Sequence, residues 1–259
     1  MSEKFQENCR IICQEKIGTG IFSMWLQTEK IAGEAKAGQF ISLYCEDGSR
    51  LLPRPISICE IRPDEGQLRI VYRVAGGGTE EFSNMQAGET VRVMGPLGNG
   101  FPTERTKPGM RAMLIGGGIG LPPLVELGRQ LSGEVQVVAG FRDERFLEEE
   151  LSSFDAYTVA TEDGSAGTKG NVLDAIQEQK LDADIIYACG PTPMLRALKA
   201  YAQTKEIECW LSLEERMACG IGACLACVCK SKEVDEHTHV HNKRVCKEGP
   251  VFLSTEVEI

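Results

Sequence analysis

The chain has 259 residues, of which 42% are hydrophobic and 25% charged, a composition that excludes a disordered protein. At a typical domain size this length corresponds to roughly two domains. The formal net charge of −10 gives no general attraction to phosphate backbones, so we expect no nucleic-acid partner.

Residues 1–16 are polar and mixed in charge, without the basic start and apolar core of a signal peptide. The longest apolar run, residues 112–125, is shorter than the about 20 residues that span a bilayer. We therefore expect a cytoplasmic protein without a membrane segment, in a compartment that keeps thiols reduced.

Short strands separated by Gly, Pro and Asp fill the first hundred residues and predict an antiparallel barrel or sandwich. They are expected at residues 21–26, 40–44, 55–61, 67–74 and 90–94. Residues 101–109 (FPTERTKPG) have the composition of a linker.

Strands then alternate with helices, which predicts an α/β domain with a parallel sheet. The strands are expected at residues 110–115, 135–140, 157–161 and 185–189, and the helices at 121–131, 172–179 and 193–204. Residues 210–217 lead into a cysteine-rich segment. The predicted division is a β-barrel at 1–102, a nucleotide-binding α/β domain at 103–210 and a small subdomain at 211–259.

Two glycine loops follow predicted strands and precede predicted helices. The first is Gly116-Gly117-Gly118-Ile119-Gly120 and the second is Cys189-Gly190-Pro191, followed by TPM. Both would open onto one crevice, because ligands of open α/β sheets bind outside the carboxyl ends of the strands. A third loop, residues 161–165, could face the same crevice. The first loop is not a G-x-G-x-x-G fingerprint, and a purely structural turn is the alternative.

Cationic side chains beside turns mark the predicted barrel. Arg54-Pro55-Ile56-Ser57 opens a strand, and the fixed proline holds an arginine that can pair with a phosphate. Arg73 precedes Gly76-Gly77-Gly78-Thr79, interpreted as a flexible turn. An exposed arginine at a strand end is the alternative for either one alone.

Five of the 11 cysteines lie between Cys219 and Cys246. Cys219, Cys224 and Cys227 have the spacing C-x4-C-x2-C with Cys246 far behind, which is the plant-type [2Fe–2S] arrangement. Small residues between them let backbone N–H groups approach the sulfurs. Structural zinc is the alternative for four cysteines. Cys229, two residues past Cys227, could compete as a ligand, but the spacing template prefers Cys227.

All three histidines lie in one short run, His237, His239 and His241. Alternation along a strand would place them on one face, where they could bind a metal. A polar hairpin between the third and fourth cluster cysteines is the favoured interpretation, since no further ligand pattern supports a second site. No Rieske spacing and no hydrolase triad can be assembled from them.

The motifs RPIS, VYR followed by GGGT, GGGIG and CGP-x-PM occur in the order of the ferredoxin–NADP reductase superfamily. With the C-terminal MACGIGACLACVC and CKEGPVF, the whole chain resembles the electron-transfer subunits of NAD-dependent dihydroorotate dehydrogenases. The segment between Cys227 and Cys246 is longer than is usual in that family.

The resemblance implies three redox groups and the residues that hold them. FAD would contact Arg54, Pro55, Ile56 and Ser57, with Arg54 on the phosphates and Ser57 near the flavin ring, and also Val71, Tyr72, Arg73, Gly78 and Thr79. The nicotinamide nucleotide would lie against Gly116, Gly117, Gly118 and Gly120 and against Cys189, Gly190 and Pro191. Cys219, Cys224, Cys227 and Cys246 would hold the cluster.

The implied reaction belongs to pyrimidine biosynthesis. Electrons from dihydroorotate, oxidised at the FMN of a separate catalytic subunit, would pass through [2Fe–2S] and FAD to NAD⁺. This chain would carry no catalytic acid or base, and the complex would be a heterotetramer of two copies of each subunit. Another NAD(P)H-dependent iron–sulfur flavoprotein subunit and a zinc-stabilised module without redox activity remain alternatives. The choice between NAD and NADP stays open at this stage.

Overall fold

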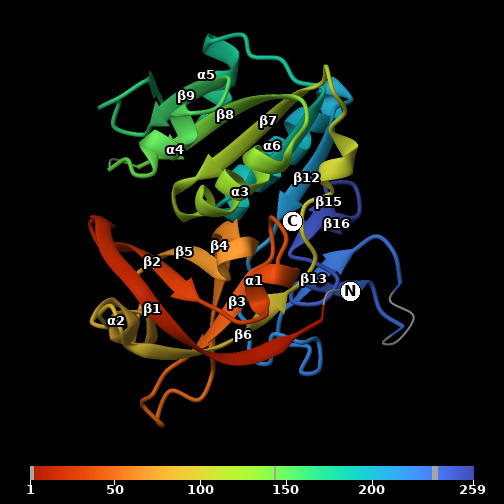
Figure 1. Ribbon diagram of the computed structural model, residues 1–259. Coiled ribbons are helices and arrows are strands. Elements are labelled where there is room, and N and C mark those ends of the chain that lie inside the picture. Colours follow the sequence, from red (N-terminus) through yellow and green to blue (C-terminus); the bar gives the residue numbers. More distant parts are fainter. Residues whose placement is uncertain (1–2, 143, 235–238) are drawn as a thin grey trace.

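A closed antiparallel barrel forms the N-terminal part of the computed structural model, which describes residues 3–142, 144–234 and 239–259 (Figure 1). Its strands close in the order β1-β2-β5-β4-β3-β6. They are β1 (Phe5–Gly18), β2 (Ile21–Gln27), β3 (Phe40–Tyr44), β4 (Arg54–Arg62), β5 (Gln67–Arg73) and β6 (Thr90–Leu97). The predicted barrel is confirmed.

Strand β1 and the short helices of the barrel were not predicted. Strand β1 carries charged side chains on its outer face and buries only one side, at Cys9 and Ile11, so it reads as a polar segment. The interpretation of residues 76–79 as a flexible turn was wrong, because α2 (Gly77–Ser83) begins there. The Thr79 hydroxyl accepts the Ala75 N–H at 2.9 Å and donates to the Gly76 carbonyl at 3.0 Å, which fixes the entry to this helix. The short α1 (Ile31–Glu34) and η1 (Pro63–Glu65) complete the barrel.

The second layer is a mostly parallel sheet in the order β10-β9-β8-β7-β11-β12-β15, as the α/β pattern predicted. Its strands are β7 (Arg111–Gly117), β8 (Glu134–Phe141), β9 (Ala156–Thr161), β10 (Thr168–Lys169), β11 (Ile185–Cys189), β12 (Glu208–Ser212) and β15 (Val251–Leu253). The connecting helices are η3 (Gly118–Gly120), α3 (Pro122–Gln130), α4 (Glu148–Ser152), α5 (Val172–Glu178) and α6 (Thr192–Lys205).

The C-terminal segment shares its core with both preceding parts. Its strands β13 (Val228–Ser231), β14 (Asn242–Arg244) and β16 (Val257–Glu258) form a small sheet. Strand β15 pairs antiparallel with β12, and Val245 and Cys246 belong to the core that contains Phe40 of the barrel. The sequence boundaries at 102 and 210 stay predictions. Within the described residues, no helix has the length and apolarity to cross a membrane.

The linker between barrel and sheet is held by one buried tyrosine. The Phe101 and Tyr187 rings meet edge to face at 5.7 Å. The Tyr187 hydroxyl lies 2.9 Å from Thr106 Oγ1 and donates to the Pro102 carbonyl at 3.2 Å. These contacts fix both ends of η2 (Thr103–Arg105) against β11.

Tyr187→Phe should therefore lower the free energy of unfolding by about 1–2 kcal/mol, because buried polar groups of the linker lose a partner. Chemical denaturation of the variant measures this change. Half-buried Tyr44, whose hydroxyl donates to the Met94 thioether at 3.8 Å, is the control, and equal effects of Tyr44→Phe and Tyr187→Phe would contradict the assignment.

Candidate functional site

The two glycine loops of the sheet domain lie directly against each other, at the carboxyl ends of β7 and β11. Strands β7 and β11 are parallel neighbours with Gly116 opposite Cys189. A Cβ on Gly120 would lie 2.2 Å from the Cys189 carbonyl oxygen, and one on Gly190 would lie 3.0 Å from the Gly117 nitrogen. Only glycine permits this approach, so the loops form one continuous wall at the carboxyl ends of the strands.

Cys189 is a half-buried thiol in this wall. Burial raises its pKa to about 12, although a hydrogen bond with Ser212 acts in the opposite direction. The thiol is therefore protonated at neutral pH and supplies shape and polarity to the wall, without acting as a nucleophile. The third loop, residues 161–165, follows β9, two strands away from β7, and is closed by the hydrogen bond from Thr161 Oγ1 to the Ala166 carbonyl at 2.8 Å.

In the barrel, Arg54 of the RPIS motif lies over Gly78 of the GGGT motif. A Cβ on Gly78 would lie 2.4 Å from Arg54 Nε, so the guanidinium rests on the bare backbone at the start of α2. Arg54 Nη1 also donates to the Leu52 carbonyl at 2.5 Å. Ser57, on the same strand, lies opposite Phe40 of β3. A cation beside a glycine backbone is a cradle that fits the pyrophosphate of FAD.

In the VYR motif, residues 71–73, the first two side chains are buried in the barrel core and the third is exposed. Val71 and Tyr72 are buried, and the Tyr72 hydroxyl donates to Gln14 Oε1 at 2.8 Å, so only their main chain is available to a ligand. Arg73 is exposed at the end of β5. A Cβ on Gly118 would lie 3.9 Å from Arg73 Nη2, so a barrel cation comes close to the first glycine loop of the sheet domain.

The four template cysteines occupy one loop and the turn after β14. Among the described residues, no three His, Cys, Asp or Glu side chains are grouped as ligands of a single metal ion. The cysteines lie as two pairs, because Cys219 hydrogen-bonds with Cys224 and Cys227 with Cys246. Two thiolates for each of two irons is the ligand set of a [2Fe–2S] cluster, so the donor set fits that group.

The backbone of this loop favours ionised sulfur at Cys219. Burial raises the pKa of this thiol, but N–H groups of Ile221, Cys224 and Ala223 point at the sulfur and lower the pKa to about 6. The Ala223 nitrogen lies 3.3 Å from Cys219 Sγ. At the other pair, burial beside Cys227 raises the pKa of Cys246 to about 12. Metal binding at that pair must displace a proton.

Two charged residues that sequence reasoning missed brace the loop. Arg244 Nη1 donates to the Gly222 carbonyl at 3.0 Å, while its guanidinium pairs with Glu248. The sequence analysis missed them because a cysteine-spacing pattern considers only the cysteines. The sequence signal that could have found them is an arginine and a glutamate four residues apart, on either side of Cys246.

The loop that carries the cysteines also lies close to the strand of the RPIS motif. A Cβ on Gly220 would lie 3.3 Å from Ser42 Oγ on β3. Ser42 is the register partner of Pro55 in the RPIS motif. The cluster cysteines and the predicted FAD strand are therefore separated by a single strand of the barrel.

Cys229 and the histidines lie away from this ligand set. Cys229 is on β13 opposite Lys243, donates to that residue's carbonyl at 3.5 Å, and has its pKa raised to about 11 by burial. Strands β13 and β14 form an antiparallel pair around the histidine run, in agreement with the predicted hairpin. His241 Nδ1 lies 3.0 Å from the Lys232 carbonyl, and His237 falls outside the described residues.

Solved structures share this architecture. An NADH-dependent reduced ferredoxin–NADP oxidoreductase is 30% identical, with a TM-score of 0.85, and covers 96% of this chain and 89% of its own. The ferredoxin–NADP⁺ reductase of Neisseria gonorrhoeae is 16% identical, with a TM-score of 0.60 over 78% of this chain and 91% of its own. The barrel and sheet thus have the fold of the ferredoxin–NADP reductases.

The C-terminal segment narrows that class. Residues 214–258 match the iron–sulfur cluster binding domain of dihydroorotate dehydrogenase B. The "Dihydroorotate dehydrogenase B (NAD(+)), electron transfer subunit" of Bacillus caldolyticus is 43% identical over 97% of this chain and 98% of its own length. The protein of the same name from Geobacillus sp. (strain WCH70) is 42% identical over the same shares. The chain belongs to this family of electron transfer subunits.

Proposed function

We propose that this chain is the electron-transfer subunit of an NAD-dependent dihydroorotate dehydrogenase. One observation carries the proposal: the cluster loop lies against β3, which pairs with the predicted FAD strand β4, and Arg73 of the next strand, β5, approaches the predicted nucleotide loop. Gly220 lies against Ser42, the register partner of Pro55, and Arg73, at the end of β5, comes close to Gly118. When bound, FAD exchanges electron pairs with a nicotinamide and single electrons with an iron–sulfur cluster.

The residues of the chain bind and orient these groups. Arg54 and the backbone at Gly78 would hold the FAD pyrophosphate, and Ser57 would approach the flavin ring. The wall formed by residues 116–120 and Cys189-Gly190-Pro191 would hold the nicotinamide nucleotide in contact with Arg73. Cys219, Cys224, Cys227 and Cys246 would ligate the cluster. None of these side chains needs to take a proton from dihydroorotate, so this chain has no catalytic base in the proposal.

The partner in this proposal is an FMN-containing dihydroorotate dehydrogenase catalytic subunit, in a heterotetramer of two copies of each. The cluster loop itself carries two exposed apolar side chains, Ile221 at 44% and Leu225 at 42% exposure. Exposed apolar side chains beside a redox site suit a partner that must approach it closely. All eleven cysteines are free thiols. Because free thiols are typical of a reducing compartment, we place the complex in the cytoplasm.

The decisive experiment combines the loaded chain with the purified catalytic subunit and measures NAD⁺ reduction that depends on dihydroorotate. Activity with NAD⁺ supports the proposal, and comparison with NADP⁺ settles the coenzyme. Absence of activity in a complex with full FMN, FAD and iron content would reject it. A colourless protein containing zinc would support the module without redox activity instead.

A second candidate function follows from the structural similarity at a TM-score of 0.85 to an NADH-dependent reduced ferredoxin–NADP oxidoreductase. The chain would then serve a complex with a different electron donor. Reduction of the cluster by ferredoxin, with no response to dihydroorotate and its catalytic subunit, would favour this candidate.

Arg54→Met should weaken FAD binding by about 10- to 100-fold, because a charge-assisted hydrogen bond to phosphate contributes about 1.5–3 kcal/mol. Fluorescence titration of the apoprotein with FAD measures the dissociation constant. Arg92→Met is the matched control, since Arg92 lies over the Tyr44 ring at 4.5 Å on another strand. An FAD affinity within twofold of wild type for Arg54→Met would contradict this role.

A further inference from the structure

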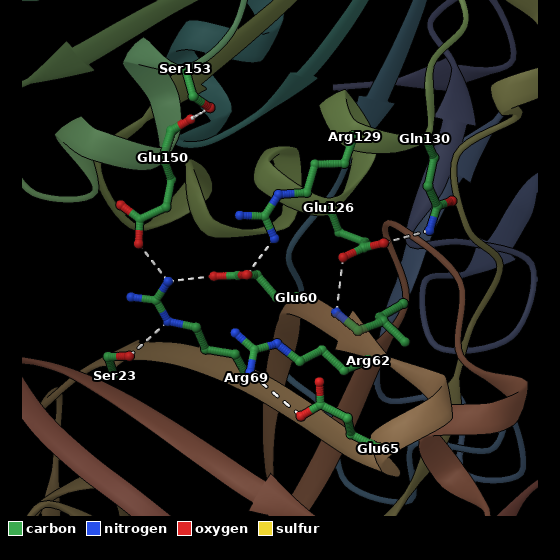
Figure 2. A network of polar contacts seen from close by, with 11 residues as sticks. Ser23, Glu60, Arg62, Glu65, Arg69, Glu126, Arg129, Gln130, Glu150 and Ser153 are labelled. Atoms are coloured by element: carbon green, nitrogen blue, oxygen red, sulfur yellow. Dashed lines mark hydrogen bonds and ion pairs between the residues drawn. The ribbon is translucent and has the colours of Figure 1, made fainter.

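A network of ion pairs joins the barrel to the helices of the sheet domain (Figure 2). Glu60 of β4 and Arg69 of β5 are cross-strand partners whose side chains form an ion pair. The second Glu60 oxygen pairs with Arg129 of α3, and Arg69 also pairs with Glu150 of α4. These four residues, two arginines and two glutamates, are called the interdomain quartet below.

A neighbouring carboxylate makes a second connection between the same elements. Glu126 of α3 accepts the backbone N–H of Ile61 on β4 at 2.9 Å. Its other oxygen accepts from Gln130 at 2.7 Å. Glu126 is only 7% exposed and Glu60 only 5%. Both carboxylates are therefore removed from water and held by partners, so their directions are fixed.

The elements joined here are those that carry the proposed FAD and nucleotide sites. Strand β4 begins with Arg54-Pro55-Ile56-Ser57 and has Glu60 near its other end. Helix α3 follows the loop of residues 116–120 directly and has Arg129 in its last turn. Strand β5 begins near Arg69 and ends at Arg73, beside Gly118. The quartet thus holds one end of each element, and the cofactor sites lie at the other end.

We propose that the interdomain quartet is a positioning group that sets the distance and angle between the flavin and the nicotinamide. This inference rests on the proposed function, because it assumes that FAD occupies the barrel site and NAD the crevice. Arg129 and Glu60 act through the strand and helix that they join and touch neither ligand.

The geometry makes hydride transfer sensitive to this contact. Ser57 is three strand residues from Glu60, about 10 Å, and Pro122, at the start of α3, is seven residues from Arg129, about 10 Å along the helix. A tilt of about 5° at the quartet therefore shifts the sites by about 1 Å relative to each other. Reacting atoms must approach to about 3–3.5 Å, and an error of about 1 Å can lower the rate about 100-fold.

The charges of the quartet balance, with two arginines facing two glutamates. Burial raises the pKa of Glu60, but its bonds with Arg129 and Arg69 outweigh burial and hold the pKa below its ordinary value. Glu60 is therefore ionised at neutral pH. Removing Arg129 leaves a buried carboxylate with one partner in place of two, which favours separation of α3 from β4.

The test uses Arg129→Gln in the protein loaded with FAD and cluster. Arg129 is a half-exposed residue in the last turn of α3, so this variant is expected to fold. In stopped-flow reduction by NADH, the limiting rate of flavin reduction should fall 10- to 100-fold, with half-saturation within twofold of wild type. A primary isotope effect from 4-deuterated NADH should increase. Reduction by dithionite, which needs no nicotinamide geometry, should be unchanged.

Amide hydrogen exchange supplies a readout independent of activity. Exchange at the Ile61 amide, bonded to Glu126, should accelerate at least fivefold in Arg129→Gln. Arg129→Lys, which keeps a charge for Glu60, should recover part of both effects. Arg111→Gln is the matched control, because it removes a 2.9 Å ion pair with Asp182 that lies within the sheet domain alone.

The outcomes separate the two proposals. A limiting rate within twofold of wild type, or an equal loss in the dithionite reaction, would overturn the positioning role. If NADH fails to reduce the wild-type flavin, the proposed function is wrong. Unchanged exchange at Ile61 in Arg129→Gln would independently show that the quartet does not hold the two parts together.

Discussion

Cys246→Ser is expected to abolish the [2Fe–2S] cluster and to leave FAD bound. Cys246 is buried and paired with Cys227, with its backbone nitrogen 3.4 Å from Cys227 Sγ, so no exposed side chain can replace it from solvent. A serine hydroxyl is a much poorer ligand for iron than a thiolate, because iron–sulfur clusters are held by soft thiolate ligands. The FAD cradle at Arg54 and Gly78 belongs to the barrel and keeps its contacts.

The visible and electron paramagnetic resonance spectra measure this result. The variant should show flavin bands without the cluster signal, and dihydroorotate-dependent NAD⁺ reduction in the complex should fall more than 1000-fold. Reduction of the bound flavin by NADH should continue. Cys229→Ser is the matched control and should keep the cluster, since the Cys229 thiol donates to the Lys243 carbonyl on the neighbouring strand. A normal cluster in Cys246→Ser would show that another residue is the ligand.

The parts of this molecule that the sequence predicted best are those specified by local patterns. Strand β11 has the predicted bounds, Ile185–Cys189, because a short apolar run buried on both faces has few other folded states. The cysteine spacing and the glycine loops are equally local. Packing of the loop at Gly120 against the one at Gly190 follows once parallel strands place both at the same edge.

Those local patterns could not predict contacts between residues that are far apart in the sequence. Arg129 and Glu60 are 69 residues apart, and Arg69 and Glu150 are 81 apart, so no spacing in the chain marks them as partners. In the sequence, each of these four residues looks like an ordinary charged residue of a strand or helix. Arg244 was missed for a related reason, because its value lies in a contact with the Gly222 carbonyl that only the folded loop creates.

Gly120→Ala should disrupt the nucleotide wall more than any other single methyl group added there. The new Cβ would lie 2.2 Å from the Cys189 carbonyl oxygen, 2.5 Å from its carbon and 2.7 Å from the Gly190 Cα. These are all backbone atoms, so no side-chain rotation can relieve the overlap. The two loops must move apart by about 1 Å, at a cost of about 2–3 kcal/mol typical of overpacking.

We expect this variant to raise the KM for NADH at least tenfold and to lower the melting temperature by several degrees, while FAD and cluster content stay normal. Gly33→Ala is the matched control, because a Cβ there meets no atom within 4 Å. Flavin reduction by NADH and thermal unfolding give the two measurements. The added Cβ would meet the neighbouring loop, so a variant that is destabilised yet binds NADH normally would mean that the close packing serves the fold alone. Loss of both thermal stability and NADH affinity would show that nucleotide binding depends on the geometry of the wall.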